Sequence, residues 1–222
     1  MIELVRATVG SHLHGTATED SDTDIVVVYI PSKKDLLLNK GKASLLLGRE
    51  KGVDIQYVDL RSFIGNAWKG DPKTIDVLLC KEQGHPIFER IRAKRDLLVN
   101  YASMRKCAHG IVHQEVKNLN RGKITGKSFA HAKRVYQLAM ESSKAYKVVD
   151  IYPVEQEILD LKLNGFNDIF AVRSELTKMH TLLSFDAFKD NREGKFKFQT
   201  ELAYWEYWVY NIYIDVIRGK IK

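Results

Sequence analysis

The first third of the chain alternates short apolar runs with polar stretches, which is the pattern of strands joined by turns. Residues 3–9 are rich in β-branched side chains and predict a short strand. Residues 24–30 form a nearly continuous apolar run, typical of a strand covered on both faces. Apolar and polar positions alternate in residues 53–58, which predicts a strand with one buried face and with Asp54 in its middle on the other face.

Beyond residue 59 the apolar positions take helical spacing. Residues 60–69 predict a helix that ends at Gly70, and Pro72 is well placed to open the next one. From about residue 96 onward the sequence has no strong strand pattern, and helices are predicted at residues 129–146, 154–163, 170–183 and 200–218. We therefore expect an α/β (α+β) chain with a small domain at residues 1–95 and a packed helical half at residues 96–222.

Size and composition are those of a globular, basic protein. The chain has 222 residues, 45% of them hydrophobic, which is enough to bury a core. Lys and Arg exceed Asp and Glu by 35 to 28, and this net charge of +7 favours a polyanionic partner such as nucleic acid or nucleotide phosphates. Cys80 and Cys107 fit no metal or disulfide spacing, so we expect buried, reduced thiols. The chain opens with no leader pattern, and its apolar runs are far shorter than the ~20 residues that span a bilayer, so a soluble, cytoplasmic protein is expected.

Two acidic residues stand two positions apart at the start of the second predicted strand. Because side chains alternate along a strand, Asp22 and Asp24 should point to the same face, where two negative charges need a cation between them. Mg²⁺ is the natural counter-charge, since it prefers carboxylate oxygens and completes its coordination with substrate phosphates. Asp54 on an adjacent strand would supply the third carboxylate of a site for two Mg²⁺ ions, which Mn²⁺ could replace. The three aspartates are therefore the predicted metal ligands and catalytic residues.

A turn suited to phosphate precedes these acids. Gly10 and Ser11 follow the first strand, where glycine permits close approach of the backbone and the turn offers N–H groups and a hydroxyl. A Gly-Ser pair or an Asp-x-Asp pair alone is a weak signal, but both together, with a third Asp on the next strand, are a strong one. Gly10 and Ser11 are therefore predicted to bind the triphosphate of an NTP beside the carboxylates.

The same block of residues resembles the signature of polymerase-beta-type nucleotidyltransferases. Gly10-Ser11, followed after about ten residues by Ser21-Asp22-Thr23-Asp24, is similar to the branch of the superfamily associated with bacterial and phage RNA ligases. That branch also has a Lys-Gly-Asn-Pro turn, to which residues 69–72 are similar although Asp71 replaces the usual Asn. Residues 131–134 are similar to its His-x-x-Arg helix motif. The resemblance touches most of the chain, and its first block is the specific one.

The resemblance implies both a fold and an activity. It implies a small mixed-sheet nucleotidyltransferase domain followed by a helical half, and the transfer of a nucleoside monophosphate from an NTP to an acceptor hydroxyl with release of pyrophosphate. Together with the basic charge, it favours an RNA end, such as that of a tRNA, as acceptor. One alternative is an adenylyltransferase that acts on a small-molecule or protein hydroxyl, of the antibiotic or antitoxin type. The other is a non-catalytic nucleotide-binding relative, against which the presence of all three carboxylates argues.

Several further residues are weaker candidates for substrate binding. Lys127, His131 and Arg134 have the i, i+4, i+7 spacing of one helical face. We predict that they bind the nucleotide from the helical side of a cleft, although a solvated basic face explains the spacing about equally well. His12 and His14 flank the Gly-Ser turn and could touch phosphate, but they are more often plain loop residues.

The last predicted helix and the basic residues of the helical half bear on the acceptor. Trp205 follows the spacing of a core stripe, whereas Tyr204, Tyr207 and Tyr210 could pack or could stack on nucleobases. Asp20 is expected to be a solvated loop acid. If the acceptor is RNA, the cations expected along its path are Lys117, Arg121, Lys123, Lys127, Lys133 and Arg134.

Overall fold

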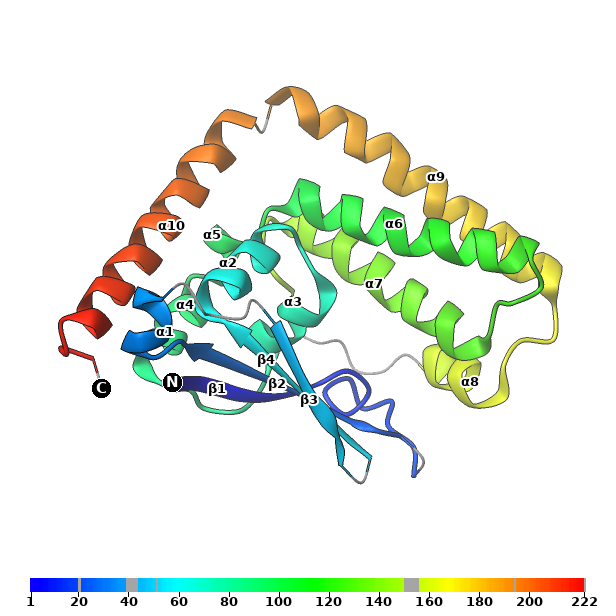
Figure 1. Ribbon diagram of the computed structural model, residues 1–222. Coiled ribbons are helices and arrows are strands. Elements are labelled where there is room, and N and C mark those ends of the chain that lie inside the picture. Colours follow the sequence, from blue (N-terminus) through cyan, green and yellow to red (C-terminus); the bar gives the residue numbers. More distant parts are fainter. Residues whose placement is uncertain (20, 39–43, 51, 150–155, 194, 222) are drawn as a thin grey trace.

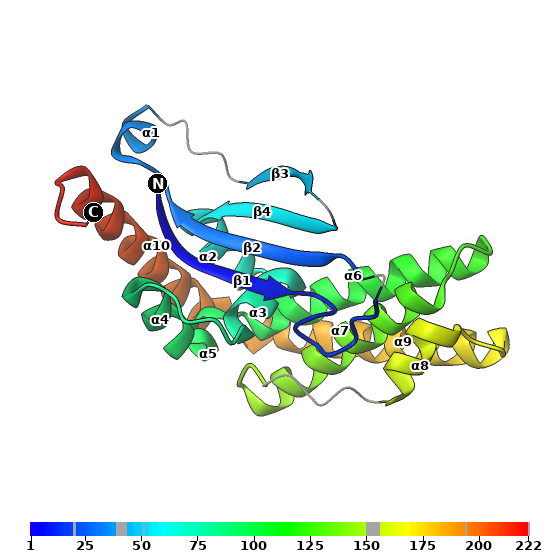
Figure 2. The ribbon, with the colours of Figure 1, turned by 90° about the horizontal axis from the view of Figure 1, so that it is seen from below.

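The computed structural model of the chain describes residues 1–19, 21–38, 44–50, 52–149, 156–193 and 195–221, with the backbone alone for residues 44–50, 185–193 and 195–201. Asp20 and the first two residues of the helix expected at 154–163 lie outside these ranges. A four-stranded sheet forms the N-terminal part, and helices cover one of its faces (Figure 1, Figure 2). The longer helices of the second half extend past one end of the strands (Figure 2).

The sheet is mixed, with strand order β1-β2-β4-β3. β1 (Ile2–Val9) runs antiparallel to β2 (Thr23–Ile30), which runs parallel to β4 (Val53–Asp59). This confirms the three predicted strands and the mixed sheet. The edge strand β3 (Ser44–Glu50), antiparallel to β4, was not predicted, because its run of leucines favours a helix as readily as a strand and it depends on β4 for pairing.

The predictions for the second strand and the third differ in outcome. β2 is buried from Val26 to Ile30, as its continuous apolar run predicts. For β4 the prediction of one buried face is wrong, because residues 53–57 are all partly exposed and burial begins at Val58, where the following helix packs. Asp54 is the second residue of this strand, not its middle. The carboxylate therefore lies at the end of the sheet.

Short helices connect the sheet to the helical half. The turn between two of them contacts the second half directly, because Gly70 has a φ of 71° and a Cβ added there would lie 2.3 Å from the Cα of Met104. Asp71 caps the helix that follows by accepting a hydrogen bond from the N–H of Thr74. The bounds are α1 Lys33–Leu37, α2 Leu60–Trp68, α3 Pro72–Leu79, α4 Pro86–Ala93 and α5 Arg95–Leu98, so both predicted helices of this region are confirmed.

Apart from the short helix α8, the second half consists of long helices, and the last one returns to the first half. α7 begins earlier than predicted because Thr125 and Ser128 form a capping box. α9 and α10 are both longer than their apolar spacing indicated. α10 packs against α1, α2 and α5, with Trp205 and Val209 buried as the core stripe predicts (Figure 1). The bounds are α6 Tyr101–Asn120, α7 Gly126–Ala145, α8 Gln156–Asn164, α9 Ile169–Glu193 and α10 Lys195–Ile217.

The hydrophobic core is continuous between the two halves, joining Phe63 and Phe88 with Phe129 and Leu176. A domain boundary near residue 95 therefore stays a prediction. Both cysteines are free, and burial raises the pKa of the Cys80 thiol to about 11, while Cys107 is half-buried. Of the helices in the described ranges, none has the length and hydropathy needed to cross a membrane.

Candidate active site

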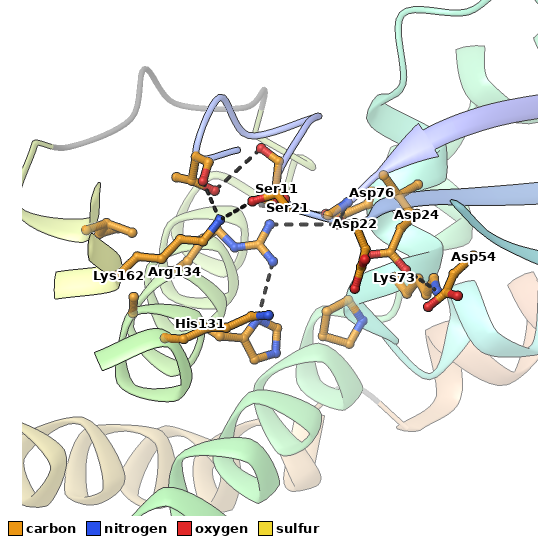
Figure 3. Close-up of a pocket in the computed structure, with 17 residues that line it drawn as sticks. Ser11, Ser21, Asp22, Asp24, Asp54, Lys73, Asp76, His131, Arg134 and Lys162 are labelled. Atoms are coloured by element: carbon orange, nitrogen blue, oxygen red, sulfur yellow. Dashed lines mark hydrogen bonds and ion pairs between the residues drawn. The ribbon is translucent and has the colours of Figure 1, made fainter. Parts of the chain in front are cut away.

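A pocket of about 440 Å³ opens where β2 and β4 begin, between the end of the sheet and helices α7 and α8 (Figure 3). Both halves of the chain contribute to its wall. The first half supplies acidic groups and the glycine turn, and the second supplies cations. Every site residue predicted from the sequence lines this pocket, namely Gly10, Ser11, Asp22, Asp24, Asp54, Lys127, His131 and Arg134.

The acidic side of the pocket is built by the parallel pairing of β2 and β4. Asp24 and Asp54 are directly paired in the register of these two strands. Because neighbouring strands lie about 4.8 Å apart, the side chains of these two paired residues project from the sheet next to each other. Asp22 lies just before β2 and lines the same pocket. The parallel register thus brings the third carboxylate to the pair that the sequence singled out.

A lysine that the sequence analysis missed neutralises part of this charge. Lys73, in the first turn of α3, forms an ion pair with Asp24 (Nζ to Oδ1, 3.3 Å) (Figure 3). Within the described residues no three His, Cys, Asp or Glu side chains are gathered closely enough to hold a metal ion. Three carboxylates on one cavity wall are nevertheless the hard oxygen donors that Mg²⁺ prefers, so the donor set fits this ion.

The Gly-Ser turn lies against the acidic wall. Gly10 has a φ of 67°, which favours glycine, and a Cβ added there would lie 3.0 Å from Asp24 Oδ2 and crowd that carboxylate. Backbone hydrogen bonds fix the turn: the N–H of His14 donates to the carbonyl of Gly10 (3.1 Å) and that of Thr16 donates to the carbonyl of Ser11 (2.9 Å). The turn therefore holds Ser11 beside the carboxylates.

A buried carboxylate on α3, also missed by the sequence analysis, anchors this turn. Asp76 accepts hydrogen bonds from the Gly10 N–H (3.3 Å) and from His14 Nε2 (2.8 Å), and lies 3.7 Å from Arg134 Nη1. His14 is therefore a buried partner of Asp76, neither a plain loop residue nor a free phosphate ligand. His12, by contrast, is exposed and bonds Thr23. An acid inside the apolar run of α3 was the available signal.

The opposite side of the pocket is cationic. Lys127 and Arg134 from α7 and Lys162 from α8 lie on it. Desolvation lowers the pKa of Lys162, and so do the neighbouring charges of Lys127 and Arg134. Desolvation also lowers the pKa of Arg134, against the attraction of Asp76. Three cations share this wall, and two of them disfavour the charge of Lys162, so an anion bound there would stabilise the site.

Lys162 and His131 complete this wall. Lys162 Nζ donates to the carbonyl of Thr16 and lies 3.3 Å from Ser21 Oγ, so it ties α8 to the loop before Asp22 (Figure 3). No local pattern in the sequence marked this lysine. His131 Nδ1 lies 3.3 Å from Arg134 Nη2, and desolvation together with that guanidinium lowers the pKa of His131. Both effects favour the neutral imidazole.

The prediction of a shared RNA path along six cations is wrong for Lys133. This side chain is buried, with ion pairs to Glu157 (2.5 Å) and Glu175 (2.8 Å), so it joins α7 to α8 and α9. Burial alone would lower the pKa of Lys133, but the carboxylates of Glu157 and Glu175 raise it. The others of the set are accessible, with Lys127 and Arg134 in the pocket and Lys117, Arg121 and Lys123 at the end of α6 and the turn after it.

Comparisons with known proteins identify relatives of this chain. Residues 4–182, which include the whole pocket, match the family RlaP, described as the RNA repair pathway DNA polymerase beta family. A protein of Enterobacteria phage T4, described as an uncharacterized 38.9 kDa protein in the nrdC-mobD intergenic region, is 28% identical over 86 residues. That match covers 35% of this chain and 26% of the phage protein. The chain is thus similar to about a quarter of the phage protein's length.

Proposed function

Because the chain belongs to the RNA repair pathway DNA polymerase beta family, a polymerase-beta-type nucleotidyltransferase family, we propose that it transfers a nucleoside monophosphate from an NTP to an RNA end. The observation that carries this proposal is the pocket itself. A wall with Asp22, Asp24 and Asp54 faces a wall with Lys127, Arg134 and Lys162 across about 440 Å³. Such a cavity suits a triphosphate that needs cationic groups on one side and a hydroxyl that must lose a proton on the other.

In the proposed complex the triphosphate lies against the cationic wall. The phosphate charge would offset the repulsion that Lys162 experiences from Lys127 and Arg134. The N–H of Gly10 donates to Asp76, so it is not available to the phosphates. In this proposal the Gly-Ser pair therefore contacts the phosphates through the hydroxyl of Ser11, which lines the pocket. Gly10 contributes through its shape, since it brings the turn against Asp24 without a side chain.

Asp22, Asp24 and Asp54 would hold two Mg²⁺ ions in this proposal, with Lys73 released from Asp24. Bound there, the ions would supply charge neutralisation at the phosphates and a lowered pKa for the acceptor hydroxyl. The acceptor oxygen forms a bond to the α-phosphorus, the bond from that phosphorus to the bridging oxygen breaks, and pyrophosphate leaves. In this proposal Asp54 receives the hydroxyl proton. The chain's own residues act mainly by orienting the reactants.

An RNA acceptor is proposed on two grounds, the name of the family and the net charge of +7. Since three carboxylates already surround the reaction centre, the excess positive charge lies elsewhere on the molecule. That distribution suits a polyanion whose end enters an acidic site while its backbone contacts basic residues.

Transfer of label from each α-labelled NTP to RNA, with Mg²⁺ present, tests the proposal. The wild type should label RNA and release pyrophosphate, and the Asp24→Asn variant should lose the activity. Asp160→Asn, which changes an exposed carboxylate on α8 outside the pocket, is the matched control and should retain it. Transfer that persists in Asp24→Asn or in excess chelator would refute the assignment of the carboxylates. Transfer to a small hydroxyl compound but not to RNA would refute the acceptor.

A further inference from the structure

A second cavity, of about 530 Å³, lies between α2 and α10, away from the candidate active site. Apolar atoms of Ile64 and Val209 contribute to its wall, and so do the rings of Tyr210 and Tyr213. Arg61 and Glu206 add one charge of each sign, and both side chains are exposed. Within the described residues neither of these two charged groups has an ion pair, so both are available to a ligand.

The cavity is held open by features that packing within the chain does not require. Gly65 lines it from the middle of α2, and a Cβ added there would meet no atom within 4 Å. Glycine in the middle of a helix lowers its stability by about 1 kcal/mol relative to alanine. Gly65 therefore leaves space in the cavity at a cost in the stability of α2. Tyr213 is fixed, because its hydroxyl donates to Asp59 (3.4 Å) and accepts from the Arg61 N–H (3.1 Å). The fixed ring of Tyr213 thus lines the cavity, and no side chain of residue 65 fills the space beside α2.

Outside the cavity lining, α10 exposes further aromatic rings. Tyr204, Tyr207 and Tyr210 are 50%, 67% and 59% exposed, which answers the question that the sequence left open: these rings do not pack in the core. The ammonium of Lys94 lies 5.9 Å from the ring centre of Tyr204. Arg90 lies 5.9 Å from the ring centre of Trp208, and neither of these two cations lines the cavity. The cavity itself combines the rings of Tyr210 and Tyr213 with the cation Arg61, and aromatic rings with a cation are the groups by which proteins bind single-stranded nucleic acid by stacking.

We propose that the α2–α10 cavity binds a nucleobase of single-stranded RNA, at a distance from the RNA end that is modified. A flat base fits between aromatic and apolar walls, Glu206 can accept a hydrogen bond from an exocyclic amino group, and Arg61 can pair with a phosphate. The proposal rests on the proposed function in one respect, that the acceptor is RNA.

The distance between the two pockets predicts how many nucleotides separate the reacting end of the RNA from the bound base. Asp54 in the active site and Asp59 beside Tyr213 are at opposite ends of β4, five residues apart. At a rise of about 3.3 Å per residue they are separated by about 17 Å. A stacked strand advances about 3.4 Å per nucleotide, so about five nucleotides separate the reacting end from the bound base. A trinucleotide should be too short to use both sites.

The test measures the affinity of a fluorescent single-stranded RNA of about 12 nucleotides, without NTP or metal, so that it does not depend on catalysis. Tyr210→Ala should weaken binding by about 5- to 150-fold, the loss expected for one stacked base. Gly65→Leu, which favours the helix and fills the cavity, should weaken it similarly while the melting temperature is retained. Phe170→Ala removes an aromatic ring that is 78% exposed on α9 and should leave affinity unchanged. Nucleotide transfer to a trinucleotide should be unaffected in both cavity variants.

The outcomes separate this proposal from the proposed function. Wild-type affinity in both Tyr210→Ala and Gly65→Leu would overturn the cavity as an RNA site and leave nucleotidyl transfer standing. Equal affinity for a free mononucleotide and for the longer RNA would also overturn it, because the cavity would then be a mononucleotide site. Loss of transfer to every acceptor in the wild type would refute the proposed function, whereas the binding difference between wild type and variants would still support the cavity.

Discussion

Replacing Asp76 should both destabilise the protein and weaken NTP binding. Asp76 is almost fully buried and accepts hydrogen bonds from the Gly10 N–H and from His14 Nε2. In Asp76→Ala both donors would lose their acceptor, and the imidazole of His14 would remain buried without it. Breaking a buried, charge-assisted pair costs about 3–5 kcal/mol. The Asp76→Asn variant keeps the volume and one acceptor oxygen, so its loss should be about 1–3 kcal/mol.

The structure links this loss to the active site. Gly10 lies against Asp24 and stands next to Ser11, so a turn released from Asp76 would move the predicted phosphate-binding hydroxyl. We therefore expect Asp76→Asn to raise the KM for NTP more than it lowers kcat, because the carboxylates on the strands stay in place. A larger effect on KM than on kcat is expected when a variant misplaces a substrate-binding turn and leaves the catalytic carboxylates in place.

Equilibrium unfolding in urea measures the first effect, and a double-mutant cycle with His14→Ala isolates the pair. The coupling energy between the two side chains should be about 1.5–3 kcal/mol, as for hydrogen bonds to charged groups. Asp160→Asn serves again as control, since it removes an exposed carboxylate. A loss under about 1 kcal/mol for Asp76→Ala, combined with no coupling to His14, would show that the buried network does not hold the turn.

Three further predictions concern the strands, the turn and the helical half. Asp54→Asn should reduce kcat of transfer by at least about 100-fold while NTP affinity, measured by calorimetry, changes little, because proton acceptance is lost and the triphosphate contacts are not; equal losses in both would contradict that role. Gly70→Ala should destabilise the chain by about 3 kcal/mol or more in urea unfolding, because the position combines a φ of 71° with a 2.3 Å approach to Met104, and a neutral result would contradict the packing. Desolvation and neighbouring imidazoles lower the pKa values of His109 and His180 at the α6–α9 contact, so the unfolded chain binds protons more readily there, and stability should be full above about pH 6.5 and fall as the pH drops toward 5. His180→Gln should flatten that slope in urea unfolding at several pH values, and an unchanged slope would refute the assignment.

Much of the first half could be predicted because its signals are local. A continuous apolar run marks β2, and the polar turn before it carries Asp22 and Asp24 within a few residues. The helices predicted at Pro72 and after Asp59 form because capping side chains and proline act on the next turn only. β3 could not be found in this way, since an edge strand of leucines is selected by its partner.

In the candidate site, too, the residues with local sequence signals could be predicted, and those brought in by packing could not. The sequence determined the acidic residues, the Gly-Ser turn and the basic face of α7, because each is a short pattern with a chemical meaning of its own. Only the tertiary structure decided that these groups line one pocket, and it added Lys73, Asp76 and Lys162, which lie on helices α3 and α8. It also removed Lys133 from the accessible cations by pairing it with acids of two other helices. Contacts between distant segments depend on how helices pack against a sheet, and no local spacing records which side chains that packing brings within hydrogen-bond distance.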